Sequence, residues 1–513
     1  MRHALETLAA GPGASRTKLV STYYDTADHV LARHGLTLRV RKQRRRFFQT
    51  VKSSGPSGGS MLGRGEWEDR IAHDRPSPHA PHSGRFLSGG IADRLLPVFR
   101  TEITRLAIPL APAPRTRIEA AIDRGKIRTA AHARVEPIRE IELELKSGSA
   151  TALYDVALQL LAIAPVRLEW RSKSLRGYRL AAGKADAPEA VYADALDLDP
   201  ALSGEEALQW VGHACVTQLL GNEAAAVGGE AEGIHQMRVA LRRFRAILSA
   251  FGKLIPPERR GAIDEELRWL AKALGEARNF DVFAGDLLGP ARATQIDGPA
   301  FDRLVKAAER RRRAAYSTAR RAILSPRYTG LLLRLMRWFD GRAWRGSTAD
   351  DAAERLKLPV GELAPALLDR RQRTARKRGK GFADQSPQQR HKLRIALKKL
   401  RYTTELFGGL YASDETQRFT KSLKRLQDEL GEANDVRVGR EIVAELTPPR
   451  VPTVAQAGQR VLAWHERRIA EAEPKLRDQM RRLRRAKPFW RDQPAVDDGY
   501  DDAGVTTRPV EPG

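Results

Sequence analysis

The sequence contains a single cysteine, Cys215, among 513 residues. One cysteine excludes a disulfide within the chain and any metal site built from several cysteines. The sequence also lacks an apolar run of about 18 residues, the length that a membrane-spanning helix needs. Its first residues, MRHALETLAAGPG, contain no apolar core of a secretory signal peptide. These absences predict a soluble cytoplasmic protein without a membrane partner.

Acidic residues are scarce relative to basic ones, with 63 Asp and Glu against 90 Lys and Arg and a net charge of +27. Residues 1–183 carry 31 basic and 17 acidic groups (+14), and residues 205–490 carry 56 and 35 (+21). Segments 184–204 (1 and 5) and 491–513 (2 and 6) are each at −4. Such an excess predicts a polyanionic partner: nucleic acid, an anionic membrane surface or a phosphate polymer. A basic surface that serves solubility alone is the alternative.

The chain is too long for one core, so two or three domains are expected. Apolar and charged residues alternate with period two in the first part, which predicts strands over residues 36–42, 47–52, 65–72, 117–128 and 139–146. A helical pattern covers 152–164, and from about 205 onward the period is near 3.6. We therefore expect an α+β multidomain protein, consisting of a β-rich domain (1–183), an acidic linker (184–204), an all-α domain (205–490) and a disordered tail (491–513).

The helical part contains an internal repeat. HQMRVALRRFR (235–245) matches HKLRIALKKLR (391–401) at an offset of 156 residues, and LGEA (274–277) matches LGEA (430–433) at the same offset. Two separate segments that share one offset indicate a duplication.

In each copy, cations are spaced by three, four and three residues, so they form one stripe along a helix beside an apolar stripe. The eight residues are His235, Arg238, Arg242, Arg245, His391, Arg394, Lys398 and Arg401. Like charges at this spacing repel each other, and a ligand with regularly repeated negative charge removes the repulsion. A solvated charged face is the alternative, but no glutamate is interleaved and the stripe occurs twice. Aromatic residues are not interleaved either, which favours phosphate over single-stranded nucleic acid.

These paired segments resemble the signatures of the CHAD family over about residues 205–490. The first copy departs from the family pattern at Arg278-Asn279-Phe280-Asp281. The resemblance implies an all-α domain of two related four-helix bundles with a basic channel between them. It further implies that the channel binds inorganic polyphosphate and that the eight residues named above line it.

The strand segments carry charges on one face. Arg39 and Arg41 share a face of their strand, Lys52 ends the next strand, and Glu140, Glu142 and Glu144 share a face of the last predicted strand. Rows of carboxylates facing rows of cations suit a divalent ion bridged to phosphate oxygens. The alternative is a solvent-facing sheet with cross-strand ion pairs.

Several segments resemble the CYTH family in order: YYDT (23–26), LRVR (38–41), QTVK (49–52), RGEWE (64–68), AIDRGKI (121–127), EIELELK (140–146) and SKSLRGYRL (172–180). The resemblance implies an antiparallel eight-stranded tunnel barrel that hydrolyses inorganic triphosphate with Mg²⁺ or Mn²⁺. The implied phosphate-binding residues are Arg39, Arg41, Lys52, Arg105, Lys173 and Arg176. The implied metal ligands are Glu142, Glu144 and Asp123, and the implied catalytic residues are Glu142, Glu144 and Lys52.

The CYTH pattern opens with a Glu-x-Glu-x-Lys strand, which is not found before Tyr23. Either the start codon is placed too far downstream or this first strand has been lost. Two functions remain open: a metal-dependent triphosphatase coupled to a polyphosphate-binding domain, or a non-catalytic polyphosphate-binding protein with an inactive barrel. Related barrels also carry adenylate cyclase and thiamine triphosphatase activities. Nucleic acid is the less favoured partner, and association with cytoplasmic polyphosphate granules is a further expectation.

Overall fold

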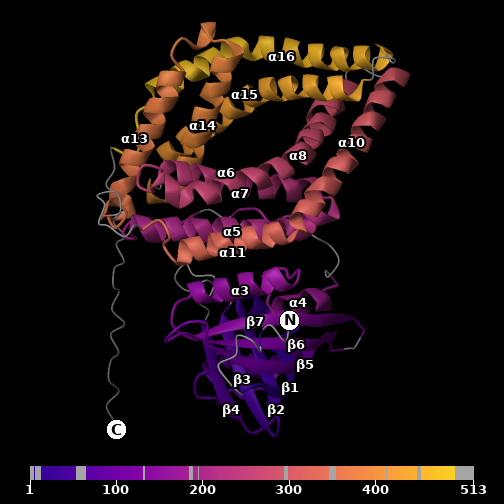
Figure 1. Ribbon diagram of the computed structural model, residues 1–513, viewed down its shortest axis with the longest axis vertical. Helices are drawn as coiled ribbons and strands as arrows, with labels where there is room; N and C mark the ends of the chain where they lie inside the picture. Colours follow the sequence, from indigo (N-terminus) through magenta and orange to yellow (C-terminus); the bar gives the residue numbers. More distant parts are fainter. Residues whose placement is uncertain are drawn as a thin grey trace.

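The computed structural model describes residues 5, 13–53, 65–130, 133–183, 189–193, 196–293, 298–345, 354–411, 413–447 and 452–491. A β-rich part and a helical part lie one against the other, with the strands at the bottom of Figure 1 and the long helices above them. The predicted tail beyond Arg491 and part of the predicted linker, residues 184–188 and 194–195, lie outside the described residues.

The β-rich part is a single antiparallel sheet of seven strands in the order β4-β3-β2-β1-β5-β6-β7. The strands are β1 (Ser15–Asp25), β2 (Leu36–Gln43), β3 (Arg46–Ser53), β4 (Glu66–Ile71), β5 (Leu96–Leu110), β6 (Arg117–Thr129) and β7 (Val135–Ser147). Seven strands are found in the described part of the chain, so the count of eight and the closure into a barrel stay predictions. A short helix, α2 (Val30–Arg33), follows β1.

The strand register divides the side chains between two faces of the sheet. Arg39 lies opposite Tyr23 of β1, Tyr23 lies opposite Phe99, and Arg105 lies opposite Asp123. The residues on the same face as these, here called the site face, include Arg41, Lys52, Glu66, Glu68, Glu140, Glu142 and Glu144. The period-two prediction that the charged residues of β2 and β7 share a face is therefore confirmed.

Helix α3 (Thr151–Ile163) covers part of the other face, where Val156 and Leu160 pack in a cluster with Ile108 and Ile118. Helix α4 (Lys173–Ala181) packs on the site face through Leu180, which belongs to a second apolar cluster with Phe99. A Cβ on Gly177 would lie 2.2 Å from the Phe99 ring, so glycine allows α4 to approach the sheet closely. This approach fixes the position of the first turn of α4.

The helical part carries nine long helices and several short ones in its described residues. The long helices are α5 (Gly204–Gly228), α6 (Ala231–Ala250), α7 (Pro257–Ala273), α10 (Pro299–Ile323), α11 (Pro326–Asp340), α13 (Val360–Arg378), α14 (Pro387–Phe407), α15 (Asp414–Leu446) and α16 (Pro452–Arg485), of which α7 and α11 are the shortest. The helical segments α8 (Gly275–Val282), η3 (Phe283–Leu288) and α9 (Gly289–Ala293) follow one another directly, and η3 is a π-helical turn.

The two sequence repeats begin helices at matching places. Helix α13 starts 156 residues after α5, and α14 starts 156 residues after α6. Both α5 and α14 begin with a capping box, formed by Ser203 with Glu206 and by Ser386 with Gln389. None of the described helices combines the length and the apolar character needed to cross a membrane.

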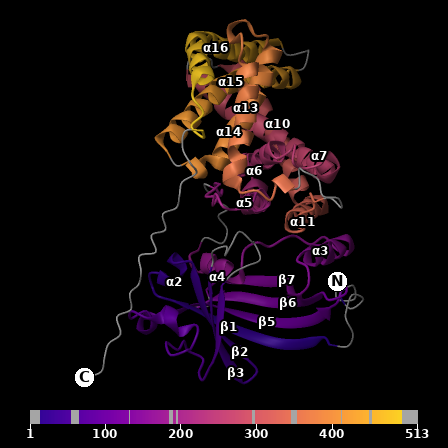
Figure 2. The ribbon, with the colours of Figure 1, turned by 90° about the vertical axis from the view of Figure 1, so that its left-hand side faces the viewer.

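The two parts of the molecule contact each other through α3 and α11, which lie next to one another in both ribbon views (Figures 1 and 2). Tyr154 of α3 is buried in the core of the helical part, and its hydroxyl donates to the carboxylate of Asp340. Nearby, Arg337 donates to Asp155 at 2.6 Å. The β-rich part is thus attached by packed side chains as well as by the connecting segment.

Candidate phosphate and metal sites

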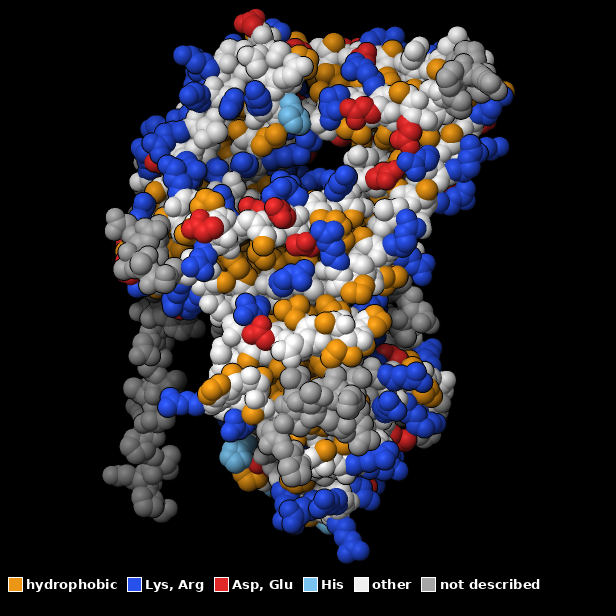
Figure 3. Space-filling view, viewed as in Figure 1, with side chains coloured by type: hydrophobic (Ala, Val, Ile, Leu, Met, Phe, Trp, Pro, Cys, Tyr) orange, Lys and Arg blue, Asp and Glu red, His pale blue; other side chains and the backbone are white. Residues whose placement is uncertain are grey.

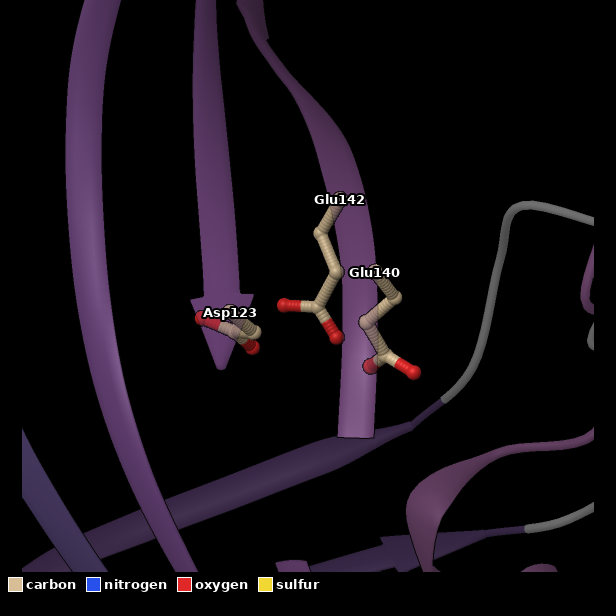
Figure 4. Close-up of side chains that lie close together, drawn as sticks. All are labelled: Asp123, Glu140 and Glu142. Carbon is tan, nitrogen blue, oxygen red and sulfur yellow. The ribbon is translucent and has the colours of Figure 1, made fainter. Parts of the chain in front are cut away.

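Three carboxylates meet on the site face. Asp123 of β6 lies directly opposite Glu140 of β7, and Glu142 follows two residues later on the same face. One oxygen from each of the three lies within 4.8 Å of the others (Figure 4). Hard divalent cations prefer such oxygen ligands. We call these three residues the acidic cluster.

Cations from two other elements hold the acidic cluster. Arg105 of β5 donates to both oxygens of Asp123, at 2.8 and 2.7 Å, and also to Glu142. Lys173, the first residue of α4, contacts all three carboxylates, with its Nζ 2.9 Å from Asp123 Oδ2. Arg176, one turn along α4, donates to Glu140 at 2.8 Å. Of the predicted phosphate-binding residues, Arg105 and Lys173 contact the predicted metal ligands Asp123 and Glu142, whereas Arg176 contacts Glu140 and Glu136.

The electrostatics of the acidic cluster favour the ionised forms of Glu142, Lys173 and Arg105. Burial alone would raise the pKa of Glu142, but the charges of Lys173 and Arg105 outweigh it and the pKa is lowered. Burial would lower the pKa of Lys173, yet the three carboxylates raise it above its usual value. The pKa of Arg105 is raised as well, chiefly by its hydrogen bonds to Asp123. Each charge is thus stabilised by a partner of opposite sign.

A second group of charges lies on β2, β3 and β4 of the same face. Arg41 donates to Glu68 at 2.8 Å, and Lys52 donates to Glu66 at 2.9 Å. Arg39 is 3.6 Å from Glu66, and the Nε atoms of Arg39 and Arg41 are buried without a hydrogen-bond acceptor. Burial, followed by the charge of Arg39, lowers the pKa of Arg41. These guanidinium groups retain unused donors for an anion.

Glu144 lies apart from the acidic cluster. Its carboxylate pairs with Lys146 at 2.6 Å, and the residue opposite it on β6 is Glu119. Its predicted role as a metal ligand stays a prediction, whereas Glu140, which the sequence places on the same face but does not single out, occupies the cluster. The alternation of β7 shows which residues share a face. It does not show which of them lies opposite Asp123, and this depends on the register.

The repeated helices α6 and α14 line a common cavity of about 530 Å³. Its walls include Arg238, Arg242, Arg245, Arg260, Arg268, Lys398, Lys399 and Tyr402. The lining residues of the cavity come from α6, α7 and α14 and include the carboxylate of Asp264. Cations from both sequence copies therefore face the same space, which we call the channel. Figure 3 shows a neighbouring hollow between α15 and the pair α6 and α8 of Figure 1, also with Lys and Arg side chains along it.

The central channel cations form no ion pair with a described residue, although the charge of Asp435 acts on Arg394 and Lys398. Arg242, Arg394 and Lys398 have no hydrogen bond or ion pair with a described residue, and Arg238 donates to the backbone oxygen of Ala271 at 3.0 Å. The Nε atoms of Arg238 and Arg394 are buried without an acceptor. By contrast, most cations of the site face are ion-paired. The channel thus holds uncompensated positive charge.

The other predicted channel residues differ in their surroundings. Arg245 is exposed and lines the cavity. His235 is half-buried, and its Nδ1 has no hydrogen-bond partner. His391 is exposed, and Arg401 pairs with Glu405 at 2.9 Å. Arg401 is therefore less available to a ligand than its counterpart Arg245.

Burial and mutual repulsion lower the pKa values of cations in and near the channel. Burial, followed by the nearby charges of Arg394 and Arg242, lowers the pKa of Lys398 to about 7. Asp435 of α15 opposes this shift, and Arg238 adds to it. The pKa of Arg394 is also lowered, again chiefly by burial. An anion in the channel would remove this penalty.

The repeated LGEA segments face these arginines. A Cβ on Gly275 would lie 3.4 Å from an Nη atom of Arg238, and a Cβ on Gly431 would lie 3.7 Å from an Nη atom of Arg394. The two glycines are separated by the repeat offset, as are the two arginines. The segment after the first LGEA supplies Arg278, whose charge lowers the pKa values of His235 and Arg238. The segment after the second LGEA supplies Asp435. The sequence repeat identified the two LGEA segments, but it did not predict that they lie next to the arginine stripe.

The affinity of the channel for polyphosphate is expected to fall about tenfold between pH 7 and pH 9. Lys398, with its pKa of about 7, loses its proton in the free protein over this range, whereas a bound polyanion favours the charged form. The pKa of His235 is lowered, so this imidazole stays neutral throughout. Titrations at constant ionic strength measure the affinity.

The matched variant is Lys398→Arg, because a guanidinium stays charged over this pH range. Its affinity is expected to change less than threefold between pH 7 and pH 9. Lys306→Arg, at an exposed position of α10, serves as the control and should keep the wild-type pH dependence. An equal fall in the wild type and in Lys398→Arg would contradict the role of Lys398.

Comparisons with known proteins match the two parts of the chain separately. A family model described as CYTH domain matches residues 4–178, and one described as CHAD domain matches residues 211–444. The crystal structure of the CHAD domain from the plant Ricinus communis is 29% identical, with a TM-score of 0.50. It covers 58% of this chain and 98% of that chain.

Two curated relatives match parts of the chain. The inorganic triphosphatase of Haemophilus influenzae is 31% identical over 163 residues, which cover 32% of this chain and 46% of that protein. An uncharacterized protein of Mycobacterium tuberculosis is 30% identical over 240 residues, or 44% of this chain and 42% of the relative. The chain thus matches less than half of the length of each of these relatives. Together with the two family models, these matches show that the chain carries a CYTH domain followed by a CHAD domain.

Proposed function

We propose that the CHAD domain binds inorganic polyphosphate in the channel. The observation that carries this proposal is that Arg242, Arg394 and Lys398 form no ion pair or hydrogen bond with a described residue, although all three are partly buried and the charge of Asp435 opposes the repulsion at Arg394 and Lys398. Charged groups removed from water are normally paired. A chain of phosphates supplies one negative charge per unit, and charge-assisted hydrogen bonds to it would offset the repulsion among the cations. His235, Arg245, His391 and Arg401 are proposed to extend this contact.

We propose that the CYTH domain hydrolyses inorganic triphosphate to pyrophosphate and phosphate. The acidic cluster of Asp123, Glu140 and Glu142 fits Mg²⁺ or Mn²⁺, since its oxygens already surround a cationic group, Lys173. When bound, such an ion would stabilise charge on phosphate and lower the pKa of a bound water. The inorganic triphosphatase of Haemophilus influenzae, which matches part of the chain, supports this reaction.

The protein groups around the acidic cluster would bind and orient the substrate. Arg39 and Arg41 of β2, Lys52 of β3 and Arg105 of β5 all lie on the site face, and they would contact phosphate oxygens. Such contacts hold the triphosphate in one orientation and neutralise the charge that develops on it. Arg176 would remain bound to Glu136 and Glu140 and fix the position of α4; its predicted phosphate contact would require exchange of these partners.

A non-catalytic role is the second candidate, and one observation favours it. Each carboxylate of the acidic cluster is already neutralised by Lys173, Arg105 or Arg176. A domain in this state would bind phosphate weakly and hold no metal, and the function would then reside in the CHAD domain. The measurement that separates the candidates is phosphate release from triphosphate with Mg²⁺ or Mn²⁺, with ATP and thiamine triphosphate as competing substrates. Absence of release under all of these conditions would leave the non-catalytic role.

Binding of long-chain polyphosphate to the full chain is expected to weaken steeply with salt, because several cation–phosphate contacts form at once. Duplex or single-stranded DNA at equal phosphate concentration should leave polyphosphate bound, since Tyr402, the aromatic residue among those that line the channel, is buried and offers bases little surface for stacking. Competition titrations at fixed salt measure this. Displacement of polyphosphate by either DNA would instead assign the channel to nucleic acid.

Two further proposals follow from the same observations. The matching starts of α5 with α13 and of α6 with α14 support a CHAD domain built from two related four-helix bundles. If the channel binds polyphosphate in the cell, a fluorescent fusion of the full chain should collect at polyphosphate granules in the cytoplasm. A diffuse signal in cells that contain granules would contradict the second of these proposals.

A further inference from the structure

Lys173 occupies the centre of the acidic cluster. Its Nζ lies 2.9 Å from Asp123 Oδ2 and also contacts one oxygen each of Glu140 and Glu142. These are the same three residues whose oxygens lie close enough together to hold a metal ion. A single ammonium group surrounded by three carboxylates stands where a cation ligated by all three would stand.

The charge of the acidic cluster is balanced by protein groups. Three carboxylates face Lys173, Arg105 and Arg176, the last of which is shared with Glu136, so most of the negative charge of the cluster is balanced and each of its six oxygens has a cationic partner. A divalent ion that approaches it meets little excess negative charge and no free oxygens. The ion cannot share the three oxygens with the ammonium, because two cations so close together repel each other strongly.

The backbone of Lys173 is fixed, whereas its side chain is flexible. Ser172 caps α4 by accepting from the backbone of Leu175, and Gly177 holds the helix against Phe99. The side chain has four rotatable carbon links, and lysine donors rotate freely. The ammonium can therefore leave the carboxylates for another anion without a shift of the helix.

We propose that Lys173 competes with the divalent ion for the acidic cluster and yields its place when triphosphate arrives. This inference rests on the proposed triphosphatase site. The phosphate oxygens offer the ammonium a new partner, which exposes the carboxylates to the metal. The metal therefore binds together with triphosphate and weakly without it. Because linkage is reciprocal, triphosphate and metal raise each other's affinity by the same factor.

The test is the affinity of the full chain for Mn²⁺ alone, measured by electron paramagnetic resonance in the absence of phosphate. Lys173→Met keeps the length of the side chain and removes its charge, so this variant is expected to bind Mn²⁺ at least tenfold more tightly than the wild type. Lys126→Met serves as the control. It removes one charge from the opposite face of β6, where Lys126 pairs with Glu102, and it should change the affinity less than twofold.

Two more variants locate the effect. Adding Glu142→Gln to Lys173→Met should abolish the gain, which places the ion on the acidic cluster. Lys173→Gln, which keeps a hydrogen-bonding end, should show the gain as well and replaces Lys173→Met if circular dichroism shows that the methionine variant is unfolded. Equal Mn²⁺ affinities of the wild type and both Lys173 variants would overturn the inference.

The outcome is separable from that of the proposed function. Triphosphate hydrolysis is measured independently on the wild type. Tighter Mn²⁺ binding by Lys173→Met in a chain that releases no phosphate would support the role of Lys173 and overturn the catalytic proposal. Hydrolysis by the wild type together with unchanged Mn²⁺ affinity in the variants would support the catalytic proposal and overturn the role of Lys173.

Discussion

Replacing Arg238, Arg242, Arg394 and Lys398 with alanine is expected to lower the affinity for polyphosphate at least about ten-thousandfold, because four charge-assisted hydrogen bonds of roughly 1.5–3 kcal/mol each are lost. Arg238, Arg242 and Lys398 line the channel from both repeats, Arg394 lies one helical turn before Lys398, and none of the four forms an ion pair with a described residue. Removal of mutually repelling, partly buried charges should leave the fold intact. Titration with long-chain polyphosphate measures the affinity, and thermal unfolding checks the fold.

The control removes four exposed arginines from α10 and changes the net charge by the same amount. These are Arg310, Arg313, Arg320 and Arg321. If binding depends on the channel, this variant should lose less than tenfold in affinity. Equal losses in the two variants would show that polyphosphate binds through overall charge, and the channel would then have no special role.

Glu142→Gln is expected to lower metal-dependent triphosphate hydrolysis about a hundredfold, which corresponds to roughly 2.7 kcal/mol of activation free energy. The substitution preserves the shape of the side chain and removes one anionic oxygen ligand. It also weakens the contacts with Arg105 and Lys173. Phosphate release from triphosphate at saturating Mg²⁺ or Mn²⁺ measures the rate.

Glu144→Gln separates the two assignments of the metal ligands. The family resemblance assigns Glu144 to the metal, whereas in the structure its carboxylate lies beside Lys146 and outside the acidic cluster. The geometry predicts a loss below about tenfold for Glu144→Gln, and a loss near a hundredfold for Glu140→Gln. The opposite order of effects would show that the ion uses Glu144 and that Glu140 serves only to hold Lys173 and Arg176.

Side-chain periodicity predicted many of the elements, but it missed two strands. β1 and β5 were not predicted from alternation. The buried positions of β1 include Ser21 and Asp25 as well as Leu19 and Tyr23, so polar and apolar residues do not separate by face. Asp25 is fully buried because it accepts hydrogen bonds from the backbone of α2 and from Tyr178. A polar residue that is satisfied by distant partners leaves no local signal.

The composition of the acidic cluster could likewise be predicted only in part from the sequence. The sequence placed Glu140, Glu142 and Glu144 on one face of β7, and the structure confirms that face. Which of them meets Asp123 depends on the register between β6 and β7, which the pattern of either strand alone does not fix. The arrival of Lys173 at this point depends in turn on the packing of α4 against Phe99.

The sequence by itself determined the features that depend on neighbours along the chain. These are the excess of positive charge, the faces of the strands, the cationic stripes of the two repeats and the resemblance to two families. The tertiary structure decided which faces meet. It brought α6 and α14 to one channel and left the central cations there without ion pairs to described residues, while it surrounded those of the sheet with carboxylates. The physical reason is that periodicity sets the direction of a side chain relative to its own backbone, whereas its charge environment is set by elements that are distant in sequence.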